Sequence, residues 1–120
     1  VTCITLSQTP VVSGEWLKEG AHLDLVGAFR PNAREADDAA ITRARVYADT
    51  RRGALKEAGD LVIPLANGIF READLQGDLF ELCRGEAQGR QNLSEITLFK
   101  SVGTAIEDLA AAMLVFKKLG

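Results

Sequence analysis

Four short runs of apolar and β-branched residues are spread along the first hundred positions of the chain. They are "VTCITL" (1–6), "LDLVGAF" (23–29), "RVYADT" (45–50) and "ITLFKS" (96–101). The first two runs are apolar enough to be covered on both faces, which is typical of parallel strands that lie under helices. Each of the four runs therefore predicts a strand, and together they predict a parallel sheet.

Helical patterns lie between and after these strands. Residues 35–44 open with acidic side chains, which the helix dipole favours at an N-terminus, and residues 51–59 predict a shorter helix that Gly59 closes. Residues 77–85 predict a short helix that ends at Gly85, while the rest of 60–95 is less regular. The order strand, strand, helix, strand, helix indicates a layered α/β fold with right-handed crossovers.

The C-terminal segment has the clearest helical period. Its apolar residues recur at alternating spacings of four and three, in one stripe: Val102, Ile106, Leu109, Met113 and Phe116. Acidic residues come early in this segment and lysines late, as the helix dipole favours. Such a stripe must pack on something, and three partners are open: the chain's own sheet, a second domain, or a partner subunit.

Composition narrows the function classes. The chain has 120 residues, 47% of them hydrophobic and 26% charged, with a net charge of -3, which describes one soluble globular domain with no strong field toward nucleic acid or a membrane surface. The sequence contains neither a membrane-spanning run nor a signal-peptide pattern, so we expect a cytoplasmic location.

The cysteines exclude two further classes. Cys3 and Cys83 lie far apart without a C-x-x-C motif, and His22 is the only histidine, so neither a metal site nor a disulfide framework is expected. Both cysteines are interpreted as reduced, packed thiols. The glycine-rich G-x-G-x-x-G turn of dinucleotide-binding sheets is also missing from the sequence. Either the fold binds no nucleotide, or the chain is the second half of a domain that does.

A family resemblance favours the second alternative. The chain resembles the ornithine cyclodeaminase/mu-crystallin family over nearly its whole length, most clearly in "DLVGAFRPNAREADDAAITRARVYADT", "ALKEAGDLVIPL" and "EITLFKSVGTAIEDLAAA". The resemblance implies that residues 1–101 are the C-terminal portion of a Rossmann-type NAD(P)-binding domain that lacks its glycine-rich half. It implies that residues 102–120 form a helix that packs toward an absent substrate and dimerisation domain. The catalytic residues are then expected before Val1.

The strand end "GAFRP" distinguishes the branches of that family. In the cyclodeaminases the matching stretch reads more like G-x-D-x-P, and its aspartate is the acid/base group. Phe29 occupies that place here, and a phenyl ring cannot take a proton. "GAFRP" followed by "READD" looks instead like the reductases of cyclic imino acids, in which an apolar wall excludes water beside the nicotinamide. The alternative from composition alone is that Phe29 is a core residue at the end of a strand.

The resemblance also implies which residues contact the cofactor, NADPH or NADH. They come from three strand ends: Thr5, Leu6 and Ser7; Val26, Gly27, Ala28 and Phe29; Lys100, Ser101 and Gly103. Other roles are open for several of them. Turn chemistry before a proline explains the hydroxyls of the first group, Ser101 stands where the helix N-cap belongs, Gly103 keeps the turn open, and Lys100 is solvated or ion-paired.

Other titratable residues are given structural roles. His22, at the entrance of its strand, is predicted to make a structural hydrogen bond. Arg34 and Glu35 are interpreted as ion-pair and dipole residues at a helix start, and Cys3 as core.

The function that follows is NAD(P)H-dependent reduction of cyclic imino acids, pyrroline-2-carboxylate or piperideine-2-carboxylate, to L-proline or L-pipecolate by a homodimeric full-length protein. The 120-residue chain alone is expected to be inactive and to bind NADPH poorly. The alternatives are an ornithine cyclodeaminase or alanine dehydrogenase of the same family, or a mu-crystallin-like protein that binds NADPH and a small ligand.

Overall fold

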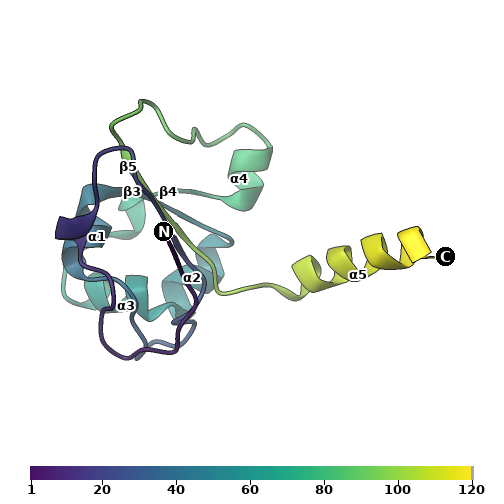
Figure 1. Ribbon diagram of the computed structural model, residues 1–120, viewed down its shortest axis with the longest axis horizontal. Coiled ribbons are helices and arrows are strands. Elements are labelled where there is room, and N and C mark those ends of the chain that lie inside the picture. The colour runs from purple at the N-terminus through teal and green to yellow at the C-terminus, as the bar shows by residue number, and fades with distance from the viewer. Residues whose placement is uncertain (120) are drawn as a thin grey trace.

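The computed structural model describes residues 1–119, and within this range the chain forms a five-stranded, all-parallel sheet in the order β1-β2-β5-β3-β4 (Figure 1). The strands are β1 (Thr2–Cys3), β2 (His22–Leu25), β3 (Ala44–Ala48), β4 (Leu75–Asp78) and β5 (Ile96–Lys100). The helices are α1 (Asp38–Arg43), α2 (Arg51–Glu57), α3 (Gly59–Ala66), α4 (Leu79–Cys83) and α5 (Ala105–Leu119), with the 3₁₀ turns η1 (Gly14–Trp16) and η2 (Glu72–Asp74). The predicted parallel α/β fold is confirmed.

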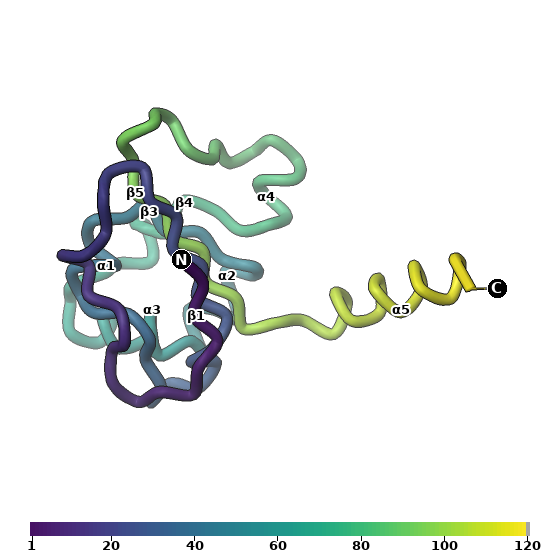
Figure 2. The backbone as a smooth tube through the Cα atoms, viewed as in Figure 1, coloured from purple at the N-terminus to yellow at the C-terminus, as the bar shows by residue number. Residues whose placement is uncertain are grey.

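The first two strands are shorter than predicted. β1 and β2 pair through only two residues each, and residues 4–7 and 26–29, which follow them, are irregular and belong to no strand (Figure 2). Ala28 has a φ of 44°, in the left-handed region that extended strands do not use. Most of the residues expected to contact a cofactor therefore lie in turns that follow the strands.

Two elements were not predicted. Helix α3 contains Pro64 and begins with Gly59, and both residues normally indicate a helix end. Gly59 is required there because a Cβ atom would lie 2.0 Å from the carbonyl oxygen of Ala33. Strand β4, "LQGD", is a short polar edge strand with only Leu75 and Gly77 buried, so it lacks an apolar signal.

The first helix begins later than predicted. Residues 35–37 are not helical, and α1 starts at Asp38 because Asp37 is its N-cap: the Asp37 carboxylate accepts the backbone N–H of Ala40 at 2.9 Å. The Asp37 carboxylate also accepts the N–H of Gly14 at 2.8 Å and the hydroxyl of Ser13. These bonds lower the pKa of Asp37 below its ordinary value, against the opposing effect of burial. Asp37 therefore ties η1 to α1.

Helices α1, α2 and α3 cover one face of the sheet, and α4 does not belong to this layer (Figure 1). The core of this face joins strand and helix residues: Leu23, Leu25, Val46, Leu98, Ala40, Ile41, Ala54 and Leu61. Burial of a large apolar side chain contributes roughly 1.5–3 kcal/mol, so this layer stabilises the sheet. On the other face, α4 and the loop after it border a shallow, mostly apolar cavity of about 340 Å³ lined by His22, Tyr47, Leu79, Leu82, Gly89, Arg90, Thr97 and Phe99.

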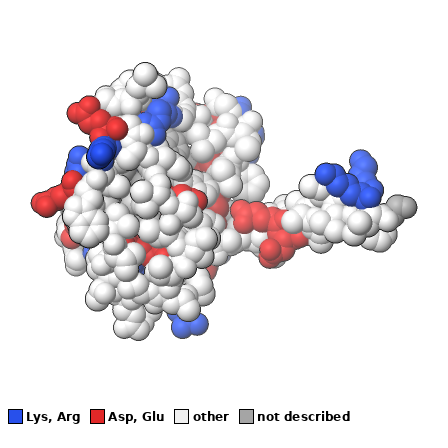
Figure 3. Space-filling model, viewed as in Figure 1, with Lys and Arg blue, Asp and Glu red and all other residues white. Residues whose placement is uncertain are grey.

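Helix α5 projects away from the rest of the molecule (Figures 1 and 2). No side chain of residues 105–119 is buried, and the large apolar ones are all more than half exposed: Ile106, Leu109, Met113, Leu114, Val115, Phe116 and Leu119. Its acidic residues lie near the sheet and its lysines at the far tip (Figure 3). The predicted helix begins three residues later than expected, so Val102 lies outside it and is half-buried. The rest of the apolar stripe, from Ile106 on, is not packed on the chain's own sheet.

Within the described part of the chain, every helix is too short or too polar to cross a lipid bilayer.

Candidate functional site

The three predicted cofactor segments meet at one edge of the sheet, where the carboxyl ends of the parallel strands lie. The N–H of Ala28 donates to the carbonyl of Thr5 at 3.0 Å, and the N–H of Ser101 donates to the carbonyl of Leu25 at 3.0 Å. The hydrogen-bonding ladder thus continues past the ends of β1, β2 and β5. In open parallel sheets this is the edge at which ligands bind.

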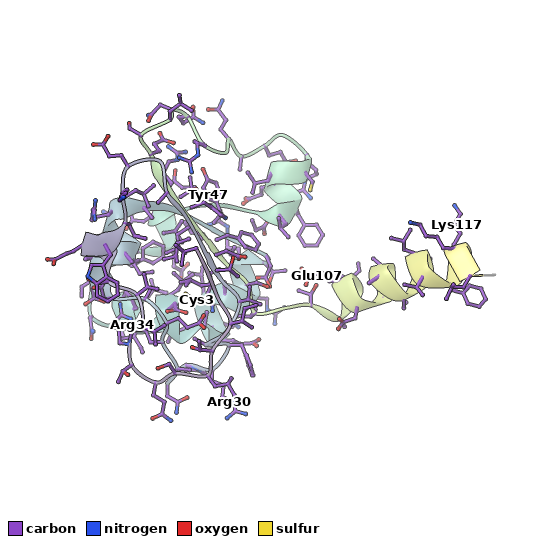
Figure 4. All side chains as sticks on the ribbon, viewed as in Figure 1. Cys3, Arg30, Arg34, Tyr47, Glu107 and Lys117 are labelled. Carbon is purple, nitrogen blue, oxygen red and sulfur yellow. The ribbon has the colours of Figure 1, made fainter. Side chains whose placement is uncertain are left out.

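Gly27 and Ala28 determine the shape of the middle segment. A Cβ atom at Gly27 would lie 2.0 Å from the carbonyl oxygen of Thr5, so only glycine allows the turns after β1 and β2 to approach so closely. Ala28 is fully buried in the left-handed region, and the chain then presents Phe29 with 42% of its surface exposed. The guanidinium of Arg30, which points away from the body in Figure 4, lies 5.7 Å from the centroid of the Phe29 ring.

Buried charges lie directly beneath this edge. Lys100, Asp60 and Glu35 are each 0% exposed. The Lys100 ammonium donates to the carbonyl of Gly27 and lies 3.1 Å from Asp60 Oδ2, an ion-pair contact rather than an aligned hydrogen bond. Asp60 Oδ1 accepts the N–H groups of Glu35 and Ala36 at 2.8 and 3.0 Å. The network therefore joins the end of β5 to the turn after β2 and to the loop before α1.

Glu35 connects the network to the first segment. Its Oε1 accepts the backbone N–H of Thr5 at 2.5 Å, and its Oε2 has no hydrogen-bond partner among residues 1–119. The interpretation of Glu35 as a helix-dipole residue was wrong, because the helix begins only at Asp38 and the Glu35 side chain turns into the core. Arg34 does form the expected ion pair, with Asp38.

Lys100 was predicted both as an ion-paired residue and as a cofactor contact. The ion pair with Asp60 is present, and the ammonium is directed inward. Any influence of Lys100 on a ligand at this edge is therefore transmitted through Gly27, whose carbonyl it binds.

The third segment is held by Asp49, a residue for which the sequence predicts no role. Asp49 Oδ2 accepts the hydroxyl of Ser101 at 3.1 Å and the backbone N–H groups of Val102 and Gly103 at 2.8 and 2.7 Å. The predicted N-cap role of Ser101 was wrong, because α5 begins at Ala105 and the Ser101 hydroxyl is used by Asp49. The signal that could have identified Asp49 is its place directly after β3, at the same carboxyl edge.

Gly103 is needed for a reason other than the predicted one. Its φ is 81°, while a Cβ atom at this position would meet no atom within 4 Å. The backbone conformation, and not the space in the turn, therefore requires glycine.

The remaining predictions concern His22 and the cysteines. His22 Nδ1 lies 2.8 Å from Thr97 Oγ1, which confirms the structural hydrogen bond. Cys3 is in the core as predicted, and burial, with the nearby carboxylates of Glu35 and Asp60, raises the pKa of its thiol. Cys83 is exposed, so its interpretation as a packed thiol was wrong: the short helix α4 buries none of its residues.

The residues at this edge fit one half of a dinucleotide. Leu6, Val26 and Phe29 expose apolar surface there, beside the half-buried Thr5 and Ser7. The hydroxyls of these two residues make the predicted turn contacts: Thr5 Oγ1 accepts the N–H of Ser7 at 3.2 Å, and Ser7 Oγ donates to the carbonyl of Thr9 at 2.6 Å. Apolar and hydroxyl groups suit a nicotinamide and its ribose. A pyrophosphate needs the glycine-rich turn at a helix N-terminus, and the sequence has none. The chemistry of the edge is thus suited to the nicotinamide end of the cofactor and not to its phosphates.

Residues 1–120 match the family model described as "Ornithine cyclodeaminase/mu-crystallin family". The chain belongs to this family. It is 44% identical to the Delta(1)-pyrroline-2-carboxylate reductase of Colwellia psychrerythraea, over 99% of this chain and 38% of that protein. The predicted fold class, the C-terminal portion of a Rossmann-type domain with a long terminal helix, is confirmed by the two solved structures that follow.

Two solved structures show the likeness in three dimensions. The Delta(1)-pyrroline-2-carboxylate reductase of Thermococcus litoralis, in complex with NADH and L-proline, is 40% identical with a TM-score of 0.93, over 98% of this chain and 36% of that one. An archaeal alanine dehydrogenase dimer with bound NAD is 32% identical with a TM-score of 0.89, over 97% of this chain and 36% of that one. The chain thus spans little more than a third of the length of these relatives.

Proposed function

We propose that the longer protein containing this chain reduces cyclic imino acids with NAD(P)H, converting pyrroline-2-carboxylate or piperideine-2-carboxylate to L-proline or L-pipecolate. The observation that carries this proposal is the exposed ring of Phe29 in the segment that follows β2. By resemblance, the matching stretch of the family's cyclodeaminases reads more like G-x-D-x-P, with an aspartate at this place. A phenyl ring cannot exchange a proton, but it can exclude water. The similarity to two pyrroline-2-carboxylate reductases supports the same reaction.

We infer that the carboxyl edge holds the nicotinamide end of the cofactor. The residues in contact would be Thr5, Leu6, Ser7, Val26, Gly27, Ala28, Phe29, Ser101 and Gly103, with Lys100 acting through Gly27. The bound cofactor would supply the hydride. Phe29 and Leu6 would exclude water, the Thr5 and Ser7 hydroxyls would orient the ribose, and the Gly27 turn would hold Phe29 in place. Residues outside this chain would donate the proton to the imine nitrogen and bind the substrate carboxylate.

We further propose that residues 1–101 belong to the cofactor domain and residues 102–120 pack toward the substrate and dimerisation domain of the longer protein. Two findings support this. All of α5 is uncovered, and the match to the reductase of Thermococcus litoralis covers 98% of the chain, so it includes α5, which has 15 of the 120 residues. The dimeric alanine dehydrogenase supports a homodimer. The cytoplasmic location stays a prediction from the sequence.

Steady-state kinetics of the full-length protein test the proposal. We expect oxidation of NADH or NADPH that depends on pyrroline-2-carboxylate and yields L-proline. Release of ammonia from ornithine would favour a cyclodeaminase, and reductive amination of pyruvate would favour an alanine dehydrogenase. Tight binding of NADPH and a small ligand with no turnover would favour a mu-crystallin-like binding protein, which Phe29 alone does not exclude.

Phe29→Ala in the full-length protein tests the role of the ring. Because small misplacements of reacting groups can lower a rate about 100-fold, we expect kcat to fall on that order while the melting temperature changes little. Phe29→Asp should also impair reduction, because it places a charge beside the nicotinamide. Phe80→Ala is the matched control, since Phe80 is a similarly exposed ring on α4. Full activity with a collapsed melting temperature in Phe29→Ala would show instead that the ring is a core residue.

A further inference from the structure

Asp49 is the most fully bonded acidic side chain at the carboxyl edge. It follows β3 directly, and it is 1% exposed. Its Oδ1 accepts the backbone N–H of Thr50 at 2.6 Å, and its Oδ2 accepts three donors from the Ser101–Gly103 turn. Fifty-two residues separate Asp49 from Ser101 in the sequence, so only the tertiary structure brings them together.

The turn that Asp49 binds has little other support. It lies between the end of β5 at Lys100 and the start of α5 at Ala105, so Val102 and Gly103 belong to neither element. Their N–H groups donate to Asp49, and Gly103 has a φ of 81°. A carboxylate that accepts several N–H groups forms charge-assisted bonds, which are stronger than neutral ones. The conformation of the turn therefore depends on this one carboxylate.

We propose that Asp49 is a positioning residue for the proposed reductase reaction: it holds the Ser101–Gly103 turn in the conformation that orients the nicotinamide end of the cofactor. This proposal rests on the proposed function. Asp49 is 1% exposed, and its two carboxylate oxygens are occupied by Thr50 and by the turn. Its effect passes through the backbone of residues 101–103, which also connects the sheet to α5.

Asp49→Asn in the full-length protein is the informative variant. Asparagine keeps the shape of the side chain but has a single acceptor oxygen and carries an NH₂ group where the second oxygen was. It can therefore satisfy either the turn or Thr50, but not both. We expect kcat for imine reduction to fall about tenfold or more, because the turn then has either no acceptor or only a neutral one, and hydrogen bonds to a neutral acceptor hold a turn less firmly than bonds to a charged one.

The matched control is Asp78→Asn. Asp78 stands at the same end of the neighbouring strand β4, and its carboxylate accepts the N–H groups of Glu81 at 3.0 Å and Arg51 at 3.4 Å. It makes no bond to the Ser101–Gly103 turn in the described residues. Asp78→Asn should lower the melting temperature without changing kcat.

A second readout separates positioning from loss of stability. Amide hydrogen exchange, followed by NMR on the full-length protein, should show faster exchange at Val102 and Gly103 in Asp49→Asn and unchanged exchange there in Asp78→Asn. Unchanged kcat per folded molecule in Asp49→Asn, or equal loss of kcat in Asp78→Asn, would overturn the proposal. If the wild-type protein binds NADH but reduces no imine, the proposed function fails. The proposal on Asp49 is then decided by the NADH dissociation constant, which must rise in Asp49→Asn and not in Asp78→Asn.

Discussion

Strand β5 leads into two regions with opposite surroundings. On one side of Lys100 lies the carboxyl edge, where charged groups are buried and bonded to the backbone of neighbouring turns. A few residues later comes α5, in which every large apolar side chain is exposed. Soluble proteins normally show the reverse arrangement, with charges outside and apolar groups inside. The edge is therefore organised within this chain, whereas no part of residues 1–119 covers α5.

The two regions also differ in how they contribute to the stability of the fold. A buried ion pair is held mainly by its geometry, since desolvation of the charges offsets much of their attraction. An apolar helix face has no preferred geometry until a partner covers it, and then each side chain contributes through burial. We therefore expect substitutions at the edge to lower the stability of the isolated chain as well as that of the longer protein. Substitutions in α5 should lower the stability of the longer protein only.

Lys100→Met should have the largest effect on stability. It leaves the Asp60 carboxylate buried without its cation, and breaking a buried pair in this way is destabilising by about 3–5 kcal/mol. Urea unfolding of the full-length protein measures the change, with Lys56→Met, an exposed lysine on α2, as control. A loss in Lys100→Met no greater than in Lys56→Met would contradict the role of the network. In Lys100→Met combined with Asp60→Asn the loss should be smaller than the sum of the two single losses.

Leu109→Ala should separate the two regions most clearly. In the full-length protein we expect a loss of about 2–5 kcal/mol, as for a leucine buried in a core. In the isolated 120-residue chain the melting temperature should stay the same, because Leu109 is 58% exposed there. Lys118→Ala, on the same helix, should change neither protein. An equal loss from Leu109→Ala in both proteins would show that α5 packs on its own sheet in solution.

Asp37→Asn should have the smallest effect, and one that depends on pH. The pKa of Asp37 is lowered from its ordinary 3.8, so the ionised carboxylate stabilises the fold above that pH, and this stabilisation is lost as the pH falls through the folded pKa. At neutral pH the variant should be less stable by about 1 kcal/mol, the typical difference between hydrogen bonds to a charged and to a neutral acceptor, because asparagine can still cap the helix. The difference should shrink when the pH is lowered below about 4. Urea unfolding at several pH values measures it, and a difference that is constant with pH would contradict the role of the charge.

Local patterns predicted most of the elements. The runs that form β2, β3 and β5 predict strands because their apolar and β-branched residues are contiguous. The sequence of α5 predicts a helix because its apolar stripe repeats over several turns. Helix α3 and strand β4 were missed where local signals oppose the final structure: Gly59 and Pro64 in a helix, and Gly77 in a polar strand. In both places tertiary contacts outweigh local propensity.

The sequence by itself determined the family, the parallel α/β class, the absence of the glycine-rich turn and the presence of a phenyl ring, Phe29, after the second strand, because each of these is a matter of residue type and local order. Only the tertiary structure decided that Lys100 points inward, that Asp49 and not a helix holds the Ser101–Gly103 turn, and that α5 is left uncovered. These properties depend on residues far apart in the sequence, such as Asp49 and Ser101, that meet only when parallel strands bring their carboxyl ends to one edge. Once buried, the charged side chains bind each other or the backbone, as Lys100 and Asp49 do. The local sequence around them does not show that they are buried.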